Sequence, residues 1–324
     1  MKRALVTGGR GFVGAWLCRG LIERGVEVRS LDRRGASERP STLAMIGADG
    51  EVDEVEGDLR DAEAINTAVA GVDAVFHLAA ETIVGTVQAD PVGGFEANVA
   101  GTWNLLEACR REGTARVVVA SSDKAYGAHD ELPYLEDMPL QPTAPYEASK
   151  AAADLIARSY WPAYGVPVAV TRFANIYGGG DLNFSRLVPE AVCAVLDGRR
   201  PVLRSDGSPI RDLLYVEDAV AAYFAIADAL DRDDVRGQAF NAGGERPYSV
   251  IEIVSEITRA SGSDLEPDVQ GTGNPEGEID KQYVDASKIA ERCGWRPAVR
   301  LSEGVERTLD WYRARPEIRP PSTA

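Results

Sequence analysis

The sequence predicts an α/β protein built on a doubly wound parallel sheet, because short β-branched runs alternate with amphipathic helical stretches through its first half. A glycine-rich turn joins the first run to the first helical stretch, and an aspartate ends the second run. The chain has 324 residues, of which 44% are hydrophobic and 27% charged. That composition is typical of a globular protein, and the length fits one large domain or two.

The expected elements follow one another at short intervals. We expect strands at residues 4–6, 27–31, 51–56, 74–78, 116–120 and 168–171, and helices at 12–24, 95–112 and 146–164. Such alternation favours parallel strands covered by helices on both faces. Beyond about residue 175 glycines cluster and the loops lengthen. We therefore expect a first domain over 1–175, to which later segments return, and a smaller second domain over 176–324.

Charge and cysteine content exclude several classes of partner. The formal net charge is −16, so the surface repels nucleic acid and anionic membranes, and we expect neither as a partner. No apolar run is long enough to span a membrane, and glycines interrupt any signal peptide at the start. Cys18, Cys109, Cys193 and Cys293 are widely spaced, so we expect four buried thiols, a cytoplasmic protein and no metal site.

Three spaced glycines follow the first expected strand. Gly8 permits a tight turn, Gly11 lets the backbone approach a pyrophosphate, and Gly14 lets the next helix pack closely on the strand. Phe12 and Val13 begin that helix, where free N–H groups and the helix dipole favour phosphate. The strand–turn–helix context predicts dinucleotide binding on a sheet of the Rossmann type.

The choice of dinucleotide depends on Asp32. It ends the second strand about twenty residues after the glycines, where a carboxylate binds the adenosine ribose hydroxyls. Because a carboxylate repels a 2′-phosphate, we expect NAD as the cofactor. Arg33 and Arg34 are adjacent and offer the alternative of accepting that phosphate.

Two further segments end strands on the same side of the sheet. We expect Asp58 to accept from the adenine amino group and Leu59 to pack on the ring; the alternative is a helix N-cap by Asp58 or Asp61. The small residues of Leu78-Ala79-Ala80 leave room for a ligand over the backbone. His77 is more typical of a packed residue at a strand end than of a catalyst.

Polar residues after the fifth strand and at the start of a later helix form the catalytic candidates. Ser122, Asp123 and Lys124 follow the strand, at the edge where open α/β sheets bind ligands. Tyr146 and Lys150 are four residues apart, so they share one helix face. An ammonium beside a phenol lowers the phenol pKa from about 10, which makes Tyr146 a base. Lys150 can also hold the nicotinamide ribose, and we expect both Tyr146 and Lys150 to contact the cofactor. The alternatives are an ordinary helix start and a surface Asp-Lys pair.

Together these motifs resemble the extended short-chain dehydrogenase/reductase family, which epimerises and dehydrates nucleotide sugars. Asn98 and the segments 172–178 and 211–218 extend the resemblance over nearly the whole chain. It implies an NAD-binding Rossmann domain, a smaller C-terminal substrate-binding domain, Asn98 at the cofactor and a nucleotide-diphosphate sugar as substrate. It also implies a homodimer formed through the helices 95–112 and 146–164.

The pair Asp123-Lys124 indicates the reaction within that family. Sugar 4-epimerases usually have small or neutral residues there, whereas 4,6-dehydratases have two ionisable ones. Ser-Asp-Lys-x-Tyr, with the segment 177–189, is similar to CDP-glucose 4,6-dehydratases. The resemblance implies that Asp123 is the acid and Lys124 the base. A carboxylate neighbour favours the charged lysine, so the alternative is that Lys124 stays charged and stabilises the enolate. A sugar 4-epimerase and a non-catalytic dinucleotide sensor remain alternatives to the dehydratase.

An acidic protein that binds a diphosphate needs local cations. Arg211 and Asn175 match the family residues that reach the diphosphate, and arginine suits this by its bidentate fork. Where many epimerases have Arg-x-x-Asp near the C-terminal end, this chain has Pro-Glu-Gly-Glu, so only Glu278 keeps the ribose contact. The expected substrate-binding residues are Glu81, Ser122, Asn175, Arg186, Leu187, Arg204, Arg211 and Glu278.

Overall fold

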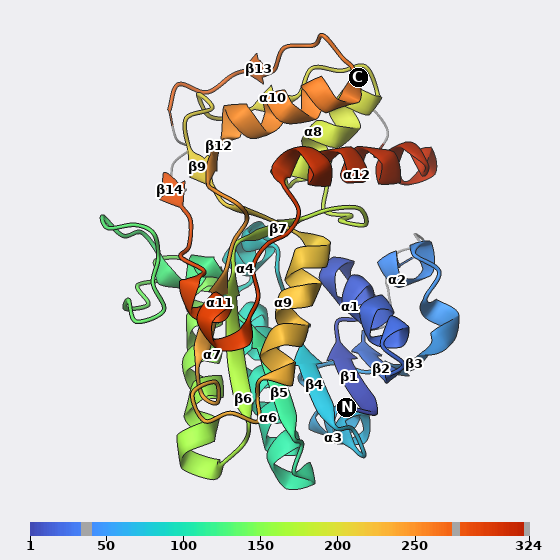
Figure 1. Ribbon diagram of the computed structural model, residues 1–324, viewed down its shortest axis with the longest axis vertical. Coiled ribbons are helices and arrows are strands. Elements are labelled where there is room, and N and C mark those ends of the chain that lie inside the picture. The colour runs from blue at the N-terminus through green and yellow to red at the C-terminus, as the bar shows by residue number, and fades with distance from the viewer. Residues whose placement is uncertain (34–40, 274–278, 321–324) are drawn as a thin grey trace.

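The protein has two lobes, as the ribbon of Figure 1 shows. The structure is a computed structural model that describes residues 1–33, 41–273 and 279–320. The lower lobe contains a twisted sheet between two layers of helices, and the upper lobe is mainly helical. The N-terminus lies in the lower lobe (Figure 1).

A seven-stranded sheet forms the centre of the lower lobe. Its strands are β1 Arg3–Thr7, β2 Glu27–Asp32, β3 Val52–Glu56, β4 Ala74–His77, β5 Arg116–Ala120, β6 Val168–Phe173 and β11 Ala239–Ala242. They lie in the order β11-β6-β5-β4-β1-β2-β3, and every pairing is parallel. The order changes direction between β1 and β4, which is where such sheets bind ligands. This arrangement confirms the predicted doubly wound fold of the Rossmann type.

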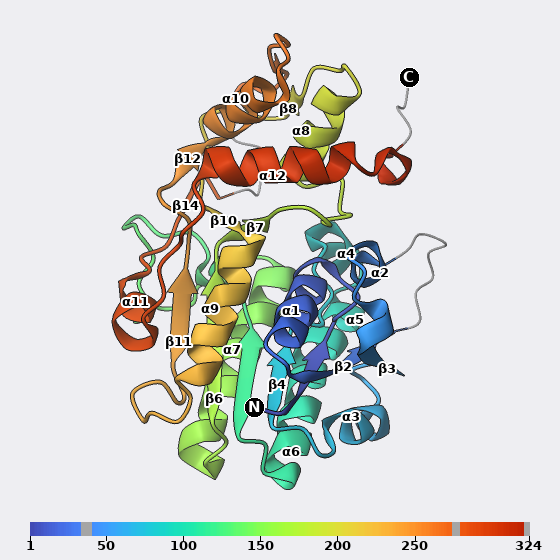
Figure 2. The same ribbon diagram turned by 45° about the vertical axis from the view of Figure 1, so that its right-hand side comes forward.

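Helices cover both faces of the sheet. One layer contains α1 (Phe12–Glu23), α9 (Val216–Asp228) and α11 (Ser287–Cys293); the other contains α3 (Ala62–Val69), α6 (Gly101–Glu112) and α7 (Pro145–Tyr164). Figure 2 shows the two layers on either side of the strands. In β5, Val118 belongs to the core beneath the first layer, and Val117 and Val119 belong to the core beneath the second. Burial on both faces explains the continuous valine run.

The expected helix at 95–112 is interrupted. α4 (Val84–Ala89) and α5 (Pro91–Phe95) precede a π-helical turn at Glu96–Ala100, and only then does α6 begin. The turn widens the helix by one residue and places Asn98 in the interior. Such turns are frequent at functional sites.

The upper lobe packs three helices around a separate core. These are α8 (Leu187–Leu196), α10 (Val250–Ser261) and α12 (Leu301–Arg313). Its short strands are β7 Asn175–Tyr177, β8 Val202–Leu203, β9 Ile210–Arg211, β10 Leu213–Tyr215, β12 Tyr248–Ser249, β13 Asp268–Val269 and β14 Lys281–Gln282. This lobe confirms the smaller C-terminal part of the predicted fold class, whereas the division at residue 175 stays a prediction.

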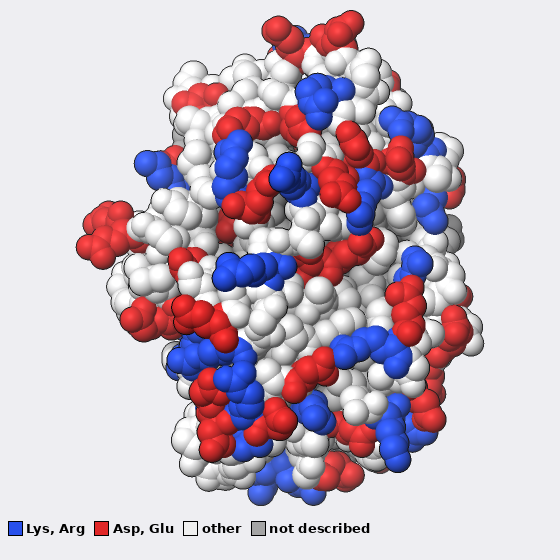
Figure 3. Space-filling model, viewed as in Figure 1, with Lys and Arg blue, Asp and Glu red and all other residues white. Residues whose placement is uncertain are grey.

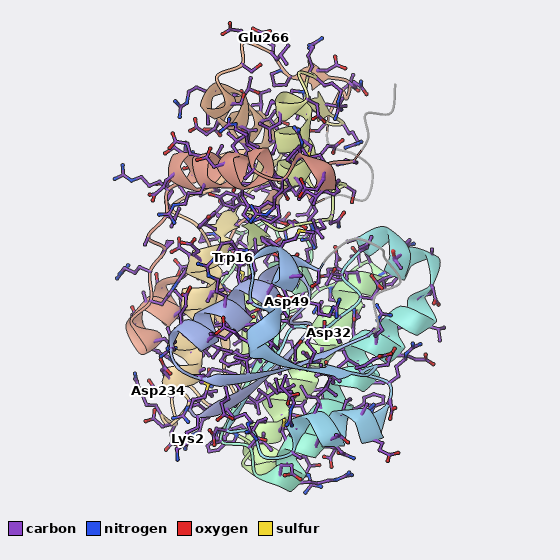
Figure 4. All side chains as sticks on the ribbon, turned by 90° about the vertical axis from the view of Figure 1, so that its right-hand side faces the viewer. Lys2, Trp16, Asp32, Asp49, Asp234 and Glu266 are labelled. Carbon is purple, nitrogen blue, oxygen red and sulfur yellow. The ribbon has the colours of Figure 1, made fainter. Side chains whose placement is uncertain are left out.

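Glycines 178–180 connect the two lobes. Trp16, labelled at the boundary in Figure 4, donates from its indole Nε1 to the Gly179 carbonyl at 2.8 Å. Thr42, which begins the short helix α2 (Thr42–Met45), donates from Oγ1 to the Gly180 carbonyl, also at 2.8 Å. A Cβ on Gly179 would lie 2.3 Å from the Trp311 ring. These contacts hold the following segment, 181–187, over the ligand-binding edge of the sheet.

The composition led us to expect an acidic surface, no membrane-spanning helix and four buried thiols. On the face drawn in Figure 3, acidic and basic side chains are interspersed. No helix among the described residues is long and apolar enough to cross a membrane. Cys18, Cys109 and Cys193 are buried as expected, but Cys293 is only partly buried because α11 lies at the rim of the fold.

Candidate functional site

A groove of about 310 Å³ lies at the carboxyl ends of β1, β2 and β4. It contains every predicted cofactor residue except Asn98, Tyr146 and Lys150. The predicted residues that line it are Gly8, Gly11, Phe12, Val13, Gly14, Asp32, Arg33, Asp58, Leu59, Leu78, Ala79 and Ala80. Glu81, which we expected at the substrate, also lines this groove.

The glycine turn leaves space for phosphate beside the backbone. Gly8 has φ +79°, a conformation that side chains rarely allow. A Cβ on Gly14 would lie 2.1 Å from the Gly8 carbonyl oxygen, so α1 can approach β1 only with glycine there. The N-terminus of α1 begins at Gly11 without a side-chain cap. Its N–H groups can therefore bind a pyrophosphate, and the groove fits the dinucleotide.

Asp32 lies at the end of β2 inside the groove (Figure 4). Its carboxylate accepts from the Ser30 hydroxyl and from the Arg10 backbone N–H at 3.3 Å. Burial raises the pKa of Asp32 to about 6. Arg33 lies 3.9 Å from the Glu81 carboxylate, and Arg34 lies outside the described residues. A partly buried carboxylate at this point favours ribose hydroxyls over a 2′-phosphate.

The segment after β3 was expected either to bind adenine through Asp58 and Leu59 or to cap a helix through Asp58 or Asp61. Asp61 caps α3, accepting the N–H of Glu63 at 2.9 Å, as the capping alternative predicts. Asp58 is paired with Arg60 at 2.8 Å, and this hydrogen bond lowers the pKa of its carboxyl. Leu59 packs against Gly101. Contact of Asp58 with adenine stays a prediction.

His77 is a structural residue held in one tautomer. The Thr7 hydroxyl, which accepts the Ala79 N–H, donates to His77 Nδ1 at 2.8 Å, because the neutral ring carries its proton on Nε2. The Thr102 hydroxyl donates to the Asn98 carbonyl at 2.7 Å, so it accepts from His77 Nε2 at 3.1 Å. Burial lowers the pKa of His77 to about 3, which keeps the ring neutral.

Asn98 connects the groove to the catalytic helix. Its Oδ1 accepts from the Glu81 N–H at 2.7 Å, and its Nδ2 donates to Ser149 Oγ at 2.9 Å. The Ser149 hydroxyl donates in turn to the Tyr146 carbonyl at 2.7 Å. Asn98 therefore orders the groove wall and the start of α7 without lining the groove itself.

Ser122, Asp123 and Lys124 lie on a short 3₁₀ turn, η3 (Asp123–Tyr126), that follows β5. Ser122 Oγ accepts from the Lys124 N–H at 3.2 Å and donates to Asp123 Oδ1 at 3.1 Å. Asp123 is only 2% exposed, and its Oδ2 has no hydrogen-bond partner in the part of the chain that is described. Burial raises the pKa of Asp123 to about 6, outweighing the charge of Lys124. A carboxyl in this state can hold a proton near neutral pH.

Tyr146 and Lys150 lie on the first turns of α7. Glu147 accepts the N–H groups of Thr143 and Ala144, which satisfies donors at the start of this helix. We expected Lys150 to lower the phenol pKa, and this expectation was wrong for the present structure. Burial raises the pKa of Tyr146 to about 12.

The lysine ammonium is directed elsewhere. Lys150 Nζ donates to the Ala120 carbonyl at 3.0 Å, and burial lowers the pKa of Lys150 to about 8. Arg186 and the Ser122 hydroxyl, rather than Lys150, act on Tyr146 in the direction that favours phenolate.

A buried ion pair fixes η3 against the helix that holds Tyr146. Arg172 on β6 makes two bonds with Asp154 on α7, at 2.7 and 2.9 Å. Its Nη1 also donates to the Tyr126 hydroxyl at 3.0 Å, and that hydroxyl donates to Asn241 Oδ1 at 2.8 Å. No role was expected for Asp154, Tyr126 or Asn241, because only the folded chain brings them together.

A second cavity, of about 530 Å³, extends from the catalytic residues into the upper lobe. Val13, Thr82 and Arg186 line both cavities, so the groove and this cavity meet there. The predicted residues that line the second cavity are Ser122, Asp123, Lys124, Tyr146, Asn175, Arg186, Leu187, Arg204 and Arg211. Glu278 lies outside the described residues.

The arginines of this cavity already have partners within the chain. Arg186 is paired with the buried Asp181 at 3.0 Å, and Arg204 with Glu190 at 2.7 Å. Arg211 donates to the carbonyls of Ile210 and Asp280. Glu190 also lines the cavity and was not predicted; its place three residues after Leu187, on the same helix face, is the signal that could have indicated it.

Comparisons with known proteins agree with this geometry. The model of the NAD dependent epimerase/dehydratase family matches residues 4–243 of this chain. The dTDP-glucose 4,6-dehydratase of Streptomyces griseus is 34% identical over 312 residues, covering 95% of this chain and 93% of that protein. The crystal structure of DesIV, a dTDP-glucose 4,6-dehydratase from Streptomyces venezuelae with NAD bound, has a TM-score of 0.85 and 33% identity, covering 97% of each chain.

An epimerase is similar as well. The UDP-glucose 4-epimerase of Thermotoga maritima, solved with UDP-glucose, has a TM-score of 0.88 and 27% identity, covering 97% of this chain and 100% of that one. These matches confirm the resemblance that the motifs predicted and the expectation of NAD as cofactor.

Proposed function

We propose that this chain, which belongs to the NAD dependent epimerase/dehydratase family, is a nucleotide-sugar 4,6-dehydratase that converts CDP-glucose to CDP-4-keto-6-deoxyglucose. The observation that carries this proposal is the buried Asp123 carboxyl beside Lys124, in the same cavity as Tyr146. Epimerisation requires acid–base chemistry only at C4. A second acid–base pair is needed when water is also eliminated across C5 and C6.

Tyr146 and Ser122 would act at C4. When bound, NAD supplies reversible hydride transfer, accepting hydride from C4 and returning it to C6. Tyr146 takes the proton of the C4 hydroxyl as the C4–H bond breaks, which leaves a ketone at C4. Arg186 and the Ser122 hydroxyl favour the phenolate, against the burial that raises the pKa of Tyr146. Proton transfer by a placed side chain contributes typically about 10²–10⁴ in rate.

Asp123 and Lys124 would act at C5 and C6. The C4 ketone acidifies the C5 proton, whose removal forms the C5–C6 double bond as the C6 hydroxyl departs. Asp123 protonates that hydroxyl, so that water leaves; burial keeps its proton available because it raises the pKa to about 6. Lys124 removes the C5 proton or, in its charged form, stabilises the enolate.

The remaining cavity residues would hold the nucleotide diphosphate. Asn175, Arg186 and Arg211 line the cavity between the catalytic residues and the upper lobe. Guanidinium groups bind diphosphate through two parallel hydrogen bonds. Arg186 also lines the cofactor groove, so it can contact both the cofactor and the nucleotide sugar.

The direct test is to incubate the purified protein with NAD and CDP-glucose and to analyse the product by mass spectrometry. We expect a nucleotide sugar that has lost one water, and Asp123→Asn should abolish its formation. A product of unchanged mass with inverted C4 would indicate the alternative, a 4-epimerase, which the similarity to the Thermotoga maritima enzyme favours. If the protein converts none of CDP-glucose, dTDP-glucose and UDP-glucose, the dehydratase proposal is contradicted.

Two variants of Lys124 separate its possible roles. Arginine stays charged at all relevant pH values and cannot serve as a base. If Lys124 is the base, Lys124→Ala and Lys124→Arg should both lose dehydration. If it stabilises the enolate by charge, Lys124→Arg should retain most of the rate that Lys124→Ala loses. Full dehydration by Lys124→Ala would exclude both roles.

We also propose a homodimer through α6 and α7. These helices pack side by side, joined by a hydrogen bond from the Tyr160 hydroxyl to Glu107 at 3.1 Å. Their outer faces expose Trp103 (45%) and Leu155 (58%), which a second copy would cover. Light scattering should give a dimer for the wild type and a monomer for Leu155→Glu, while Leu135→Glu, at an exposed loop residue, should remain dimeric. A monomeric wild type would contradict the proposal.

A further inference from the structure

Asp181 and Arg186 form an ion pair at the place where the cofactor groove meets the substrate cavity. Arg186 Nη1 donates to Asp181 Oδ2 at 3.0 Å. Arg186 lines both the groove and the cavity. The Asp181 side chain is 4% exposed and that of Arg186 is 42% exposed, so the carboxylate is buried while the guanidinium reaches the space for the ligands. Asp181 takes no part in the proposed proton transfers.

The backbone on both sides of this pair is held in place. Asp181 Oδ1 accepts the Asn183 N–H at 3.0 Å, and the Asp181 carbonyl accepts from the Tyr312 hydroxyl. The Arg186 carbonyl accepts the Glu190 N–H at 3.0 Å, which is the first hydrogen bond of α8. Because both backbone positions are fixed, the bond to the Asp181 carboxylate determines where the guanidinium lies.

Tyr146 lies in the same cavity, among ionisable groups of both signs. Burial raises the pKa of Tyr146 to about 12, and the Arg186 guanidinium is the largest influence in the opposite direction. Asp123 and Glu147 favour the neutral phenol. Lys150 is on the same helix, but its ammonium donates to a backbone carbonyl of β5. From the neighbouring elements η3 and α9, Lys124 and Tyr223 also line this cavity.

We infer that Asp181 is a positioning residue, which holds the Arg186 guanidinium where its charge stabilises the Tyr146 phenolate. The inference rests on the proposed function, in which Tyr146 takes the proton of the C4 hydroxyl. A guanidinium has five N–H groups, so Arg186 can keep its bond to Asp181 while it contacts the sugar diphosphate. Without the carboxylate, this long side chain would turn towards solvent, and its effect on the phenol would fall with distance.

A fluorinated tyrosine placed at position 146 tests the inference without turnover. Fluorination makes the phenol more acidic, so its titration ends before alkali unfolds the protein, and fluorine NMR reports this side chain alone. Arg186→Gln removes the charge and should raise the titration midpoint by about one pH unit. Arg186→Lys keeps the charge on a flexible stem and should recover part of that change. An unchanged midpoint in Arg186→Gln would overturn the inference.

Two variants of Asp181 separate positioning from screening. The carboxylate is itself an anion, so if it only screened the guanidinium, removing it would lower the midpoint. Asp181→Ser still accepts the Asn183 N–H, but its shorter side chain does not reach the guanidinium, so the midpoint should rise as in Arg186→Gln. Asp181→Asn keeps an acceptor for the guanidinium and should restore the wild-type midpoint or lower it further. A midpoint that falls or does not move in Asp181→Ser would refute positioning.

The pH profile of kcat gives a second readout, with a matched control. The acid limb should move up in Arg186→Gln and Asp181→Ser, so that kcat at a fixed pH below it falls about tenfold. Arg204→Gln is the control, because it removes the same charge from the same cavity, where Arg204 pairs with Glu190 at 2.7 Å. It should raise KM for the nucleotide sugar and move neither the midpoint nor the limb. An equal move in Arg204→Gln would overturn the inference, since any charge in the cavity would then suffice.

The failure of this inference and that of the dehydratase proposal are distinguishable, because the fluorine titration needs no substrate. Midpoints that move as expected, without water loss from any nucleotide glucose, would support the positioning role of Asp181 and refute the dehydratase. Water loss by the wild type, with midpoints that do not move in the variants, would support the dehydratase and refute the positioning role.

Discussion

Replacing Asp123 by asparagine should make the protein more stable at neutral pH while it removes dehydration. The wild-type carboxyl is 2% exposed, and its Oδ2 has no hydrogen-bond partner within the described ranges. Ionising such a group is unfavourable in the folded state. Asparagine has almost the same shape but never ionises, so the folded variant avoids that penalty at the pH where the enzyme works.

The structure gives the size and sign of the effect. Burial raises the pKa of Asp123 from 3.8 to about 6, roughly two units, and one unit corresponds to about 1.36 kcal/mol. The folded state therefore holds this proton more tightly than the unfolded state does. Its contribution to stability is complete below about pH 3.8 and is lost as the pH rises through about 6. Between about pH 4 and about pH 7, Asp123→Asn should gain about 3 kcal/mol on the wild type.

Urea unfolding of both proteins across that pH range measures the gain. Other groups titrate equally in the two proteins, so they cancel in the difference. Asp206→Asn is the control: hydrogen bonds from Ser208 lower the pKa of that exposed carboxyl, so the variant should not gain on the wild type as the pH rises. A stability difference for Asp123→Asn that is independent of pH, or that falls with rising pH, would refute the reasoning.

Three further changes test other parts of the site. Tyr146→Phe should lower kcat by about 10²–10⁴ with NAD affinity unchanged, because only the proton acceptor is lost; undiminished turnover would exclude Tyr146 as the base. Gly14→Ala should weaken NAD binding and destabilise the fold by about 1–3 kcal/mol, since its Cβ would lie 2.1 Å from the Gly8 carbonyl oxygen. Gly85→Ala is the control, because a Cβ on Gly85 would meet no atom within 4 Å. This control should behave as wild type in NAD titration and thermal melting. Arg172→Met leaves Asp154 charged and buried, so it should cost about 3–5 kcal/mol in urea unfolding, and the added change Asp154→Asn should restore part of the loss; equal stability of the single variant and wild type would contradict this.

The features that depend on local sequence could be predicted. The strands follow from runs such as Val117 to Val119, which are apolar throughout because both faces are covered. The glycine turn follows from backbone geometry at Gly8 and Gly14. The place of Ser122 at the ligand-binding edge follows from the rule that parallel strands end at one edge.

The features that depend on partners distant in the sequence could not be predicted. The π-helical turn that places Asn98 has no clear signal in composition, so the sequence indicated one continuous helix. The predicted direction for the pKa of Tyr146 was wrong, because burial raises this pKa and Lys150 bonds to the Ala120 carbonyl instead. The pair Glu190–Arg204 joins residues fourteen apart across a helix and a strand, and only folding shows that they meet.

The fate of the C4 hydrogen tests the central proposal most directly. CDP-glucose with deuterium at C4, incubated with the protein and NAD, should give a 4-keto-6-deoxy product that carries the deuterium on C6. The reason is that the hydride removed from C4 would return to C6 of the same sugar once Asp123 has protonated the departing C6 hydroxyl. Deuterium found again on C4, in a sugar that has lost no water, would contradict the account and establish epimerisation instead.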